Sequence, residues 1–177
     1  MKNTIIFIIA IIIAGGSGFA LHKYLNQQHA QNNPAIGIAR PEFAAMDLND
    51  QLRNISEWDG KVIVLNFWAT WCPPCLKEIP DFIEIHKTYG NKDFQIIGIA
   101  IDGKDAVREY ASKTGINYPI LVLEADGIAL ANRYGNEMGA LPFTAIINRN
   151  GKISNTITGE LSKKDAIKIL KKLGANF

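Results

Sequence analysis

The sequence predicts an α/β fold in which helices cover both faces of a mixed β-sheet. Two runs of strand length, 62–67 and 94–101, are apolar almost throughout, which is typical of strands buried on both faces. A stretch with helical spacing of apolar residues separates them, and this strand–helix–strand order implies a right-handed crossover between parallel strands. Asn150-Gly151 is a strong hairpin signal, so the last two strands are expected to be antiparallel.

The first half of the folded body is predicted to begin with a β-hairpin. Residues 42–48 and 51–55 flank Asn49-Asp50 with weak alternation, which indicates a short hairpin in front of the main sheet. After the strand at 62–67, a helix is expected from Cys75 to Tyr89, ended by Gly90. Its predicted apolar face comprises Leu76, Ile79, Phe82, Ile83 and His86.

The second half alternates short strands and helices. The predicted elements are a strand at 94–101, a helix at 105–113, a strand at 118–123, a helix at 127–134, strands at 140–147 and 153–157, and a last helix opened by a capping box of Ser162 and Asp165. The order is therefore β–α–β–(αβα)–β–β–α, a mixed sheet with a central αβ insertion.

The N-terminal 40 residues differ from the rest of the chain. Lys2 is followed by an uncharged stretch at 4–21, close to the roughly 17–25 residues that span a bilayer. Residues 1–21 are therefore predicted to be a membrane anchor or uncleaved signal, with Lys2 in the cytoplasm and the body exported. The alternative is a signal peptide cleaved at Gly18-Phe19-Ala20, which has the small-x-small pattern of a cleavage site. Residues 22–40 are rich in Asn and Gln, which predicts a flexible linker, and 41–177 form the folded domain.

Composition limits the functions to consider. The 177 residues are 47% hydrophobic, enough for one domain with a core, and the net charge of +2 is too small to indicate a nucleic-acid partner. The chain has only two cysteines, Cys72 and Cys75. All of its thiol chemistry therefore lies at one point, where the strand at 62–67 passes into a helix.

This position suits the cysteine pair for thiol–disulfide exchange. Cys72 is expected at the N-cap and Pro73 at the first helical position, where proline loses no hydrogen bond. The positive end of the helix dipole then favours the thiolate and lowers the pKa of the Cys72 thiol. Cys75, one turn further, is covered by the helix and stays a thiol longer. A nucleophile beside a resolving thiol is the unit that exchange requires.

Two other interpretations of the pair remain open. A structural disulfide across so short a loop would add little stability through the unfolded state. A structural zinc site needs four ligands, and the chain has no second cysteine pair.

Several motifs extend the pattern beyond the cysteines. They are Leu65-Asn66-Phe67-Trp68-Ala69-Thr70-Trp71-Cys72-Pro73-Pro74-Cys75, Lys77-Glu78-Ile79-Pro80, Gly98-Ile99-Ala100-Ile101-Asp102, Tyr118-Pro119, Leu141-Pro142-Phe143-Thr144 and Asn150-Gly151-Lys152. With them the chain resembles the thioredoxin fold and, more narrowly, membrane-tethered thiol–disulfide reductases of the TlpA/ResA/CcmG type, over roughly residues 41–173. The resemblance implies a thioredoxin-like α/β fold with an N-terminal β-hairpin extension and a central αβ insertion.

The resemblance also implies roles for single residues. Cys72 would attack a substrate disulfide and Cys75 would resolve the mixed disulfide. Pro142 would be a cis proline beside the cysteines, which lets Leu141 offer backbone hydrogen bonds to a bound peptide. Trp71 would shield the disulfide and line the docking surface, although a packing role is equally compatible with its position.

A carboxylate takes part in the implied mechanism. The family often manages the proton of the second cysteine with a residue at the position of Glu78; the alternative is a solvent-exposed glutamate beside Lys77. Thioredoxins proper place a buried aspartate where this chain has Asn66. Because Asn66 cannot accept that proton, Glu78 becomes the stronger candidate for the proton acceptor. Asn66 itself could be a core amide with its hydrogen bonds satisfied.

The resemblance implies an exported, membrane-anchored enzyme that reduces protein disulfides on the outer side of a bacterial inner membrane. Electrons would come from a membrane dithiol donor, the clients could be apocytochrome c haem-site cysteines or another assembly protein, and no bound cofactor is needed. One alternative is a peroxiredoxin-like thiol peroxidase, which uses a lone cysteine with a nearby threonine and arginine. Another is a copper-binding assembly factor, which would add a remote histidine such as His86 to the cysteines.

Overall fold

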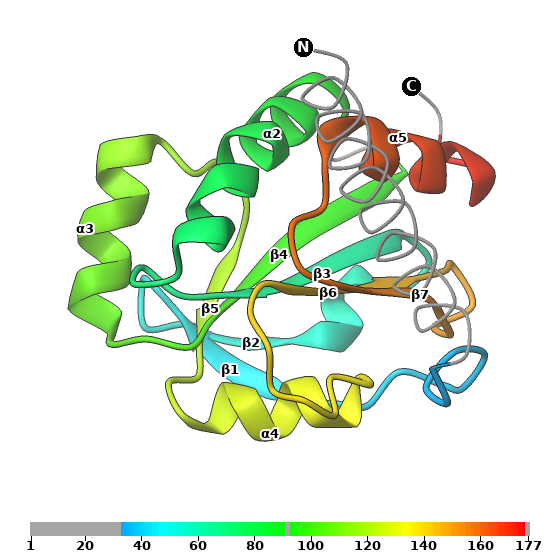
Figure 1. Ribbon diagram of the computed structural model, residues 1–177, viewed down its shortest axis with the longest axis horizontal. Coiled ribbons are helices and arrows are strands. Elements are labelled where there is room, and N and C mark those ends of the chain that lie inside the picture. Colours follow the sequence, from blue (N-terminus) through cyan, green and yellow to red (C-terminus); the bar gives the residue numbers. More distant parts are fainter. Residues whose placement is uncertain (1–32, 91–92, 176–177) are drawn as a thin grey trace, which may run out of the picture. The chain divides into compact units, whose positions relative to one another are not determined.

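A computed structural model describes residues 33–90 and 93–175 of the chain. Within them the strands form one seven-stranded sheet in the order β2-β1-β5-β4-β3-β6-β7 (Figure 1). The strands are β1 (Ala44–Asp47), β2 (Leu52–Asn54), β3 (Val62–Trp68), β4 (Phe94–Ala100), β5 (Ile120–Val122), β6 (Phe143–Ile147) and β7 (Ile153–Thr158). The helices are the 3₁₀-helix η1 (Ile55–Trp58), α2 (Pro73–Tyr89), α3 (Lys104–Thr114), α4 (Asp126–Arg133) and α5 (Lys163–Lys172).

The sheet is mixed, as predicted. β3, β4 and β5 are parallel, whereas β6 pairs antiparallel with β3 and β7 antiparallel with β6. The predicted N-terminal hairpin is β1–β2, and β1 extends the main sheet by pairing antiparallel with β5. The carboxyl ends of the three parallel strands meet at one edge, where sites commonly form in α/β sheets.

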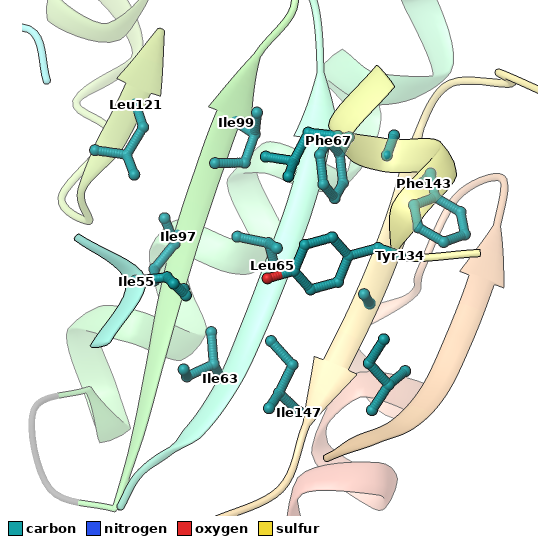
Figure 2. Close-up of a cluster of buried hydrophobic side chains, with 14 of the residues drawn as sticks. Ile55, Ile63, Leu65, Phe67, Ile97, Ile99, Leu121, Tyr134, Phe143 and Ile147 are labelled. Atoms are coloured by element: carbon teal, nitrogen blue, oxygen red, sulfur yellow. The ribbon is translucent and has the colours of Figure 1, made fainter. Parts of the chain in front are cut away.

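Alternation along β3 divides the core between the two faces of the sheet. All seven residues of β3 are buried. Ile63, Leu65 and Phe67 belong to one cluster, which also contains Tyr134 and Phe143 (Figure 2). Because successive strand residues point to opposite faces, Asn66 and Trp68 point to the other face. The polar Asn66 is therefore inserted among apolar neighbours on that second face.

Helices cover both faces, as the sequence predicts. The cluster around Leu65 and Phe67 includes Leu130 and Ala131 of α4 and residues of η1. The opposite face packs against α2, α3 and α5, whose buried members include Ile79, Val107 and Leu170. Figure 1 shows α4 on one side of the sheet and α2 and α5 on the other.

Several details of the predicted elements are wrong: α2 begins at Pro73 instead of Cys75, and β5 covers Ile120–Val122 instead of 118–123. Strand β6 begins at Phe143 instead of residue 140, because the Leu141–Pro142 peptide bond is cis and proline has no N–H group for a ladder bond. On α2, Ile85 and Glu78 are buried, whereas Leu76 and Ile83 are only partly buried at the margin of the packed face. The spacing of apolar residues could not predict that Glu78 is buried, because its side chain is polar.

The predicted linker also ends earlier than expected. Residues 34–40 pack against the body: the Gly37 N–H donates to the Ile153 carbonyl at 2.8 Å, and the Arg40 N–H to the Gly151 carbonyl at 2.8 Å. The Arg40 side chain lies within 2.6 Å of an Asp59 carboxylate oxygen. These bonds to the β6–β7 turn and to Asp59 fix a segment whose composition suggested a tether, so the folded unit starts at Pro34.

The predicted anchor at 1–21 and the linker as far as residue 32 lie outside the described residues. Among residues 33–90 and 93–175, no helix is both long and apolar enough to span a membrane.

Candidate active site

The cysteine pair lies at the start of α2, just after the loop that connects this helix to β3. Cys72 is the N-cap of α2, with extended backbone angles, and Pro73 occupies the first helical position. The Cys72 N–H donates to the Ala69 carbonyl, and the Cys72 carbonyl accepts the N–H of Leu76, both at 3.2 Å. The structure therefore confirms the strand–turn–helix position that the sequence predicts for this pair.

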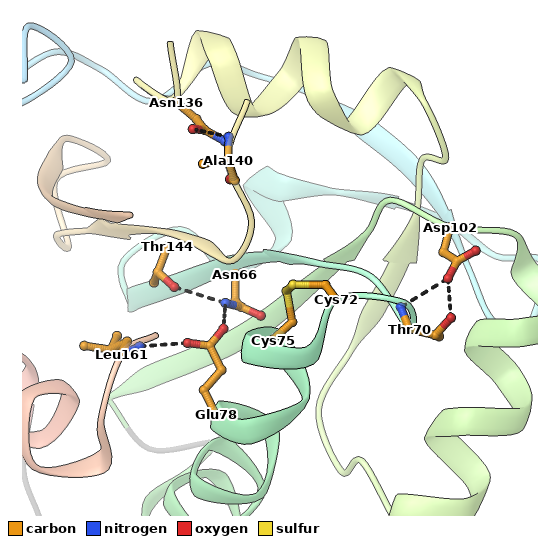
Figure 3. Close-up of a disulfide and its surroundings, with 10 residues drawn as sticks. All are labelled: Asn66, Thr70, Cys72, Cys75, Glu78, Asp102, Asn136, Ala140, Thr144 and Leu161. Atoms are coloured by element: carbon orange, nitrogen blue, oxygen red, sulfur yellow. Dashed lines mark hydrogen bonds between the residues drawn. A yellow bond between two sulfur atoms is a disulfide. The ribbon is translucent and has the colours of Figure 1, made fainter. Parts of the chain in front are cut away.

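The two cysteines form a disulfide, and their surroundings differ. The Cys72–Cys75 bond joins Cα atoms 5.3 Å apart (Figure 3). Cys75 is fully buried and Cys72 is 4% exposed. Cys72 lines a groove at the surface of the molecule, but Cys75 does not. A partner sulfur can therefore approach Cys72 from outside, while Cys75 lies behind it.

Asp102, just after the end of β4, binds the loop that leads to Cys72. Asp102 accepts hydrogen bonds from the N–H of Thr70, at 3.1 Å, and from the Thr70 hydroxyl. Its other oxygen accepts the N–H of Gly103 at 2.7 Å. Asp102 therefore ties the ends of β3 and β4 together beside the disulfide (Figure 3). The signal in the sequence was an acidic residue directly after a buried strand.

Glu78 is buried beneath the disulfide, one turn beyond Cys75 on α2. Only 1% of the residue is exposed, so the solvent-exposed alternative is wrong. Its carboxylate accepts the N–H of Leu161 at 2.8 Å and the side-chain amide of Asn66 at 2.7 Å. Burial raises the pKa of Glu78 to about 7, against the opposing effect of these two bonds. The group is thus poised to gain or lose a proton near neutral pH.

Asn66 and Thr144 complete a polar network on this face of the sheet. The Asn66 amide nitrogen donates to the Thr144 hydroxyl at 3.0 Å as well as to Glu78, and both residues are fully buried. They are directly paired across β3 and β6, so their side chains share one face. Sequence reasoning missed Thr144 in this network, because only the pairing register brings it to Asn66.

The groove beside Cys72 is apolar, and part of its wall is formed by Ile128 of α4, in the central insertion. Its volume is about 320 Å³, and its lining includes Trp71, Cys72, Pro73, Pro74, Ile128, Gly139 and Leu141. Trp71 is 64% exposed, and the Leu141–Pro142 bond is cis as expected. The sequence pointed to Trp71 and Leu141, but Ile128 on α4 and Gly139 in the loop after it were missed, because no motif marked either residue.

A family model described as Redoxin matches residues 35–173, which include the whole sheet and every site residue named above. The chain belongs to the Redoxin family. This redoxin is 33% identical to the thiol-disulfide oxidoreductase ResA of Bacillus thuringiensis (strain Al Hakam), over 97% of this chain and 98% of that protein. It is 31% identical to ResA of Geobacillus thermodenitrificans, over 89% of this chain and 88% of that protein.

A solved structure gives the same picture of the fold. The thiol:disulfide interchange protein of the thioredoxin family from Chlorobium tepidum superposes on this redoxin with a TM-score of 0.70 and 31% identity, covering 76% of this chain and 94% of that one. The thioredoxin-like fold and the ResA-type resemblance expected from the motifs are therefore confirmed.

The buried carboxyl group predicts a pH-dependent stability. Because the pKa of Glu78 is raised from 4.5 to about 7 in the folded protein, the native state binds this proton more tightly than the unfolded state between those values. The oxidised protein should lose up to about 3 kcal/mol of unfolding free energy as the pH rises through this window. Urea unfolding from about pH 5 to pH 8 should show this loss in the wild type and not in Glu78→Gln.

Glu109→Gln is the matched control, because Glu109 is an exposed glutamate on α3. It should follow the wild-type curve. If Glu78→Gln loses stability with pH as steeply as the wild type, Glu78 does not titrate in this window.

Proposed function

We propose that this redoxin reduces protein disulfides outside the cytoplasmic membrane. It is a thiol–disulfide oxidoreductase, the activity for which its ResA relatives are named. The observation that carries the proposal is the asymmetry of the Cys72–Cys75 disulfide at the start of α2, with Cys72 lining a groove and Cys75 enclosed.

In the reduced enzyme, Cys72 is the nucleophile. Its thiolate attacks one sulfur of a substrate disulfide, forms a mixed disulfide and releases the first substrate thiolate. Cys75 then gives up its proton and attacks the Cys72 sulfur, which releases the second substrate thiolate and leaves the Cys72–Cys75 disulfide. A membrane dithiol donor returns two electrons and is itself oxidised to a disulfide.

The start of α2 favours the thiolate of Cys72 through the helix dipole. Pro73 and Pro74 occupy the first two helical positions, so Cys75 supplies the first N–H group of the helix. Fewer free amides face the sulfur than at an ordinary helix start. A thiolate stabilised only moderately fits a reductant, because strong stabilisation of the reduced form makes an oxidant.

Glu78 serves as the proton acceptor for Cys75 in this mechanism. The carboxyl group lies one helical turn beyond Cys75, on the buried side of α2. Its pKa of about 7 lets it take up a proton when Cys75 attacks and release it afterwards. A glutamate with an ordinary pKa would be a weaker base at this point.

Protein substrates dock along the groove, with Trp71, Leu141 and Pro142 as contact residues. Trp71, Ile128 and Met138 are among the few large apolar side chains exposed on the described part of the molecule, and two of them line the groove. Within residues 33–90 and 93–175, no hydrogen bond engages the backbone of Leu141. Its N–H and carbonyl are free to bind an extended peptide beside the cis bond.

The cellular setting is inferred from the N-terminal sequence. The uncharged stretch at 4–21 would anchor the protein in the cytoplasmic membrane, with the redoxin body on the outer side. Apocytochrome c with oxidised haem-site cysteines is a client with the required chemistry, since haem attachment needs free thiols.

The two alternative functions find less support. A peroxiredoxin-like peroxidase uses a lone cysteine, whereas both cysteines here share one disulfide. A copper-binding factor would need His86 near them, but His86 lies near the other end of α2 from Cys75, roughly 16 Å along the helix. In the described part of the chain, no three His, Cys, Asp or Glu side chains are arranged to hold a metal ion.

Replacement of the resolving cysteine tests the proposal. Cys75→Ser should accumulate mixed disulfides between Cys72 and client proteins, because the second step cannot occur. Adducts should appear on a non-reducing gel of cells expressing the variant and disappear with reductant, and mass spectrometry should identify the clients. Cys72→Ser is the control and should trap none.

Failure of Cys75→Ser to form any adduct would contradict Cys72 as the nucleophile. A reduction potential near the DsbA value of about −120 mV would contradict the reductive direction.

The groove predicts a separate effect on protein substrates. Ile128→Glu should lower kcat/KM for reduction of a disulfide-containing protein such as insulin by roughly fivefold or more, because it removes apolar contact and introduces a charge. Reduction of a small disulfide, 5,5′-dithiobis(2-nitrobenzoic acid), should change less than about twofold. Leu52→Glu is the matched control, since Leu52 is an exposed leucine on β2. An equal loss of kcat/KM in both variants would show that the groove does not bind the protein substrate.

A further inference from the structure

One buried acceptor in the active site has no partner. The side chain of Asn66 is fully buried, and both protons of its amide nitrogen are used, by Glu78 and Thr144. Its oxygen, Oδ1, makes no hydrogen bond within residues 33–90 and 93–175. Leaving a buried acceptor unpaired typically costs about 1–3 kcal/mol, so such groups are rare and call for an explanation.

The orientation of this amide is determined by its neighbours. The Glu78 carboxylate is held from one side by the Leu161 N–H at 2.8 Å and from the other by Asn66 at 2.7 Å. While Glu78 is ionised, turning the amide over would set Oδ1 against a carboxylate oxygen, acceptor against acceptor. With the nitrogen facing Glu78, Oδ1 points toward Cys75 (Figure 3).

The redox state of Cys75 decides whether this oxygen can be satisfied. In the disulfide, neither sulfur carries a hydrogen. Reduction by a dithiol breaks the Cys72–Cys75 bond, adds two electrons, and places a proton on Cys75, while the dithiol becomes a disulfide. The resulting thiol is a hydrogen-bond donor, although a weak one.

We propose that Asn66 is a positioning residue whose Oδ1 accepts a hydrogen bond from the Cys75 thiol in the reduced protein and so stabilises the dithiol relative to the disulfide. The bond also favours the thiol of Cys75 over its thiolate, which keeps Cys75 protonated while Cys72 attacks the substrate disulfide. The inference rests on the proposed function, because it requires the two cysteines to cycle between the states.

The equilibrium with glutathione tests this. Asn66→Leu removes the bonds to Glu78 and Thr144 in both states, whereas the bond from the Cys75 thiol to Oδ1 is lost only in the dithiol. At a fixed ratio of reduced to oxidised glutathione, the fraction of disulfide should rise, with the equilibrium constant moving about three- to tenfold, or about 15–30 mV toward more negative potential. Thr144→Val disturbs the same network without touching Oδ1 and should change the constant less than about twofold.

A second measurement does not depend on the Leu variant's folding. Cys72→Ser leaves Cys75 as the one thiol of the chain, so the infrared S–H stretching band of this variant reports Cys75 alone. The band should lie at lower wavenumber than that of a free thiol in an apolar solvent. A band at the free-thiol position would overturn the inference, and so would an equal glutathione equilibrium in wild type and Asn66→Leu.

These outcomes separate the inference from the proposed function. If the wild type equilibrates with glutathione but Asn66→Leu leaves the constant unchanged, only the role of Asn66 is wrong. If the wild type does not exchange with glutathione at all, the function itself is wrong.

Discussion

The connection between β3 and α2 is the constraint on which the rest of the site depends. Four residues separate the end of a fully buried strand at Trp68 from the first helical residue, Pro73. A connection this short brings the start of α2 to the carboxyl edge of the sheet. It therefore fixes Cys72 at the helix N-terminus beside the groove and places Cys75 inside. Asp102, bonded to Thr70 from the neighbouring strand's exit, holds the connection in place.

The second feature is a buried carboxyl group, Glu78, held close to the Cys72–Cys75 disulfide. In the proposed mechanism, reduction of a substrate by Cys72 and Cys75 moves protons, and Glu78 takes up the proton that Cys75 gives up. Burial in an apolar core raises the pKa of Glu78, and hydrogen bonds from Leu161 and Asn66 keep it near 7 instead of higher. The same apolar surroundings that stabilise the fold therefore set the proton affinity of Glu78, on which the proposed mechanism depends.

Local signals in the sequence were sufficient for the fold and for part of the site. The apolar run of β3 and the proline after Cys72 predicted the strand and the N-cap, and the family resemblance pointed to Glu78. Local signals could not predict which residues of strands distant in the sequence lie opposite each other in the sheet. Thr144 joins Asn66 only because β6 pairs antiparallel with β3, and the Leu161 N–H reaches Glu78 from the loop before α5. Residues 34–40 look like a tether, yet backbone bonds to the β6–β7 turn region fix them.

The most direct measurement is the relative rate at which the two thiols of the reduced protein are alkylated. The full chain would be reduced, treated with iodoacetamide at neutral pH, quenched at successive times and digested, and each modified cysteine quantified by mass spectrometry. Cys72 should react at least about tenfold faster than Cys75, because it lines the groove and adjoins the positive end of α2. Equal rates, or faster modification of Cys75, would contradict the division of the pair into an accessible nucleophile and an enclosed resolving thiol.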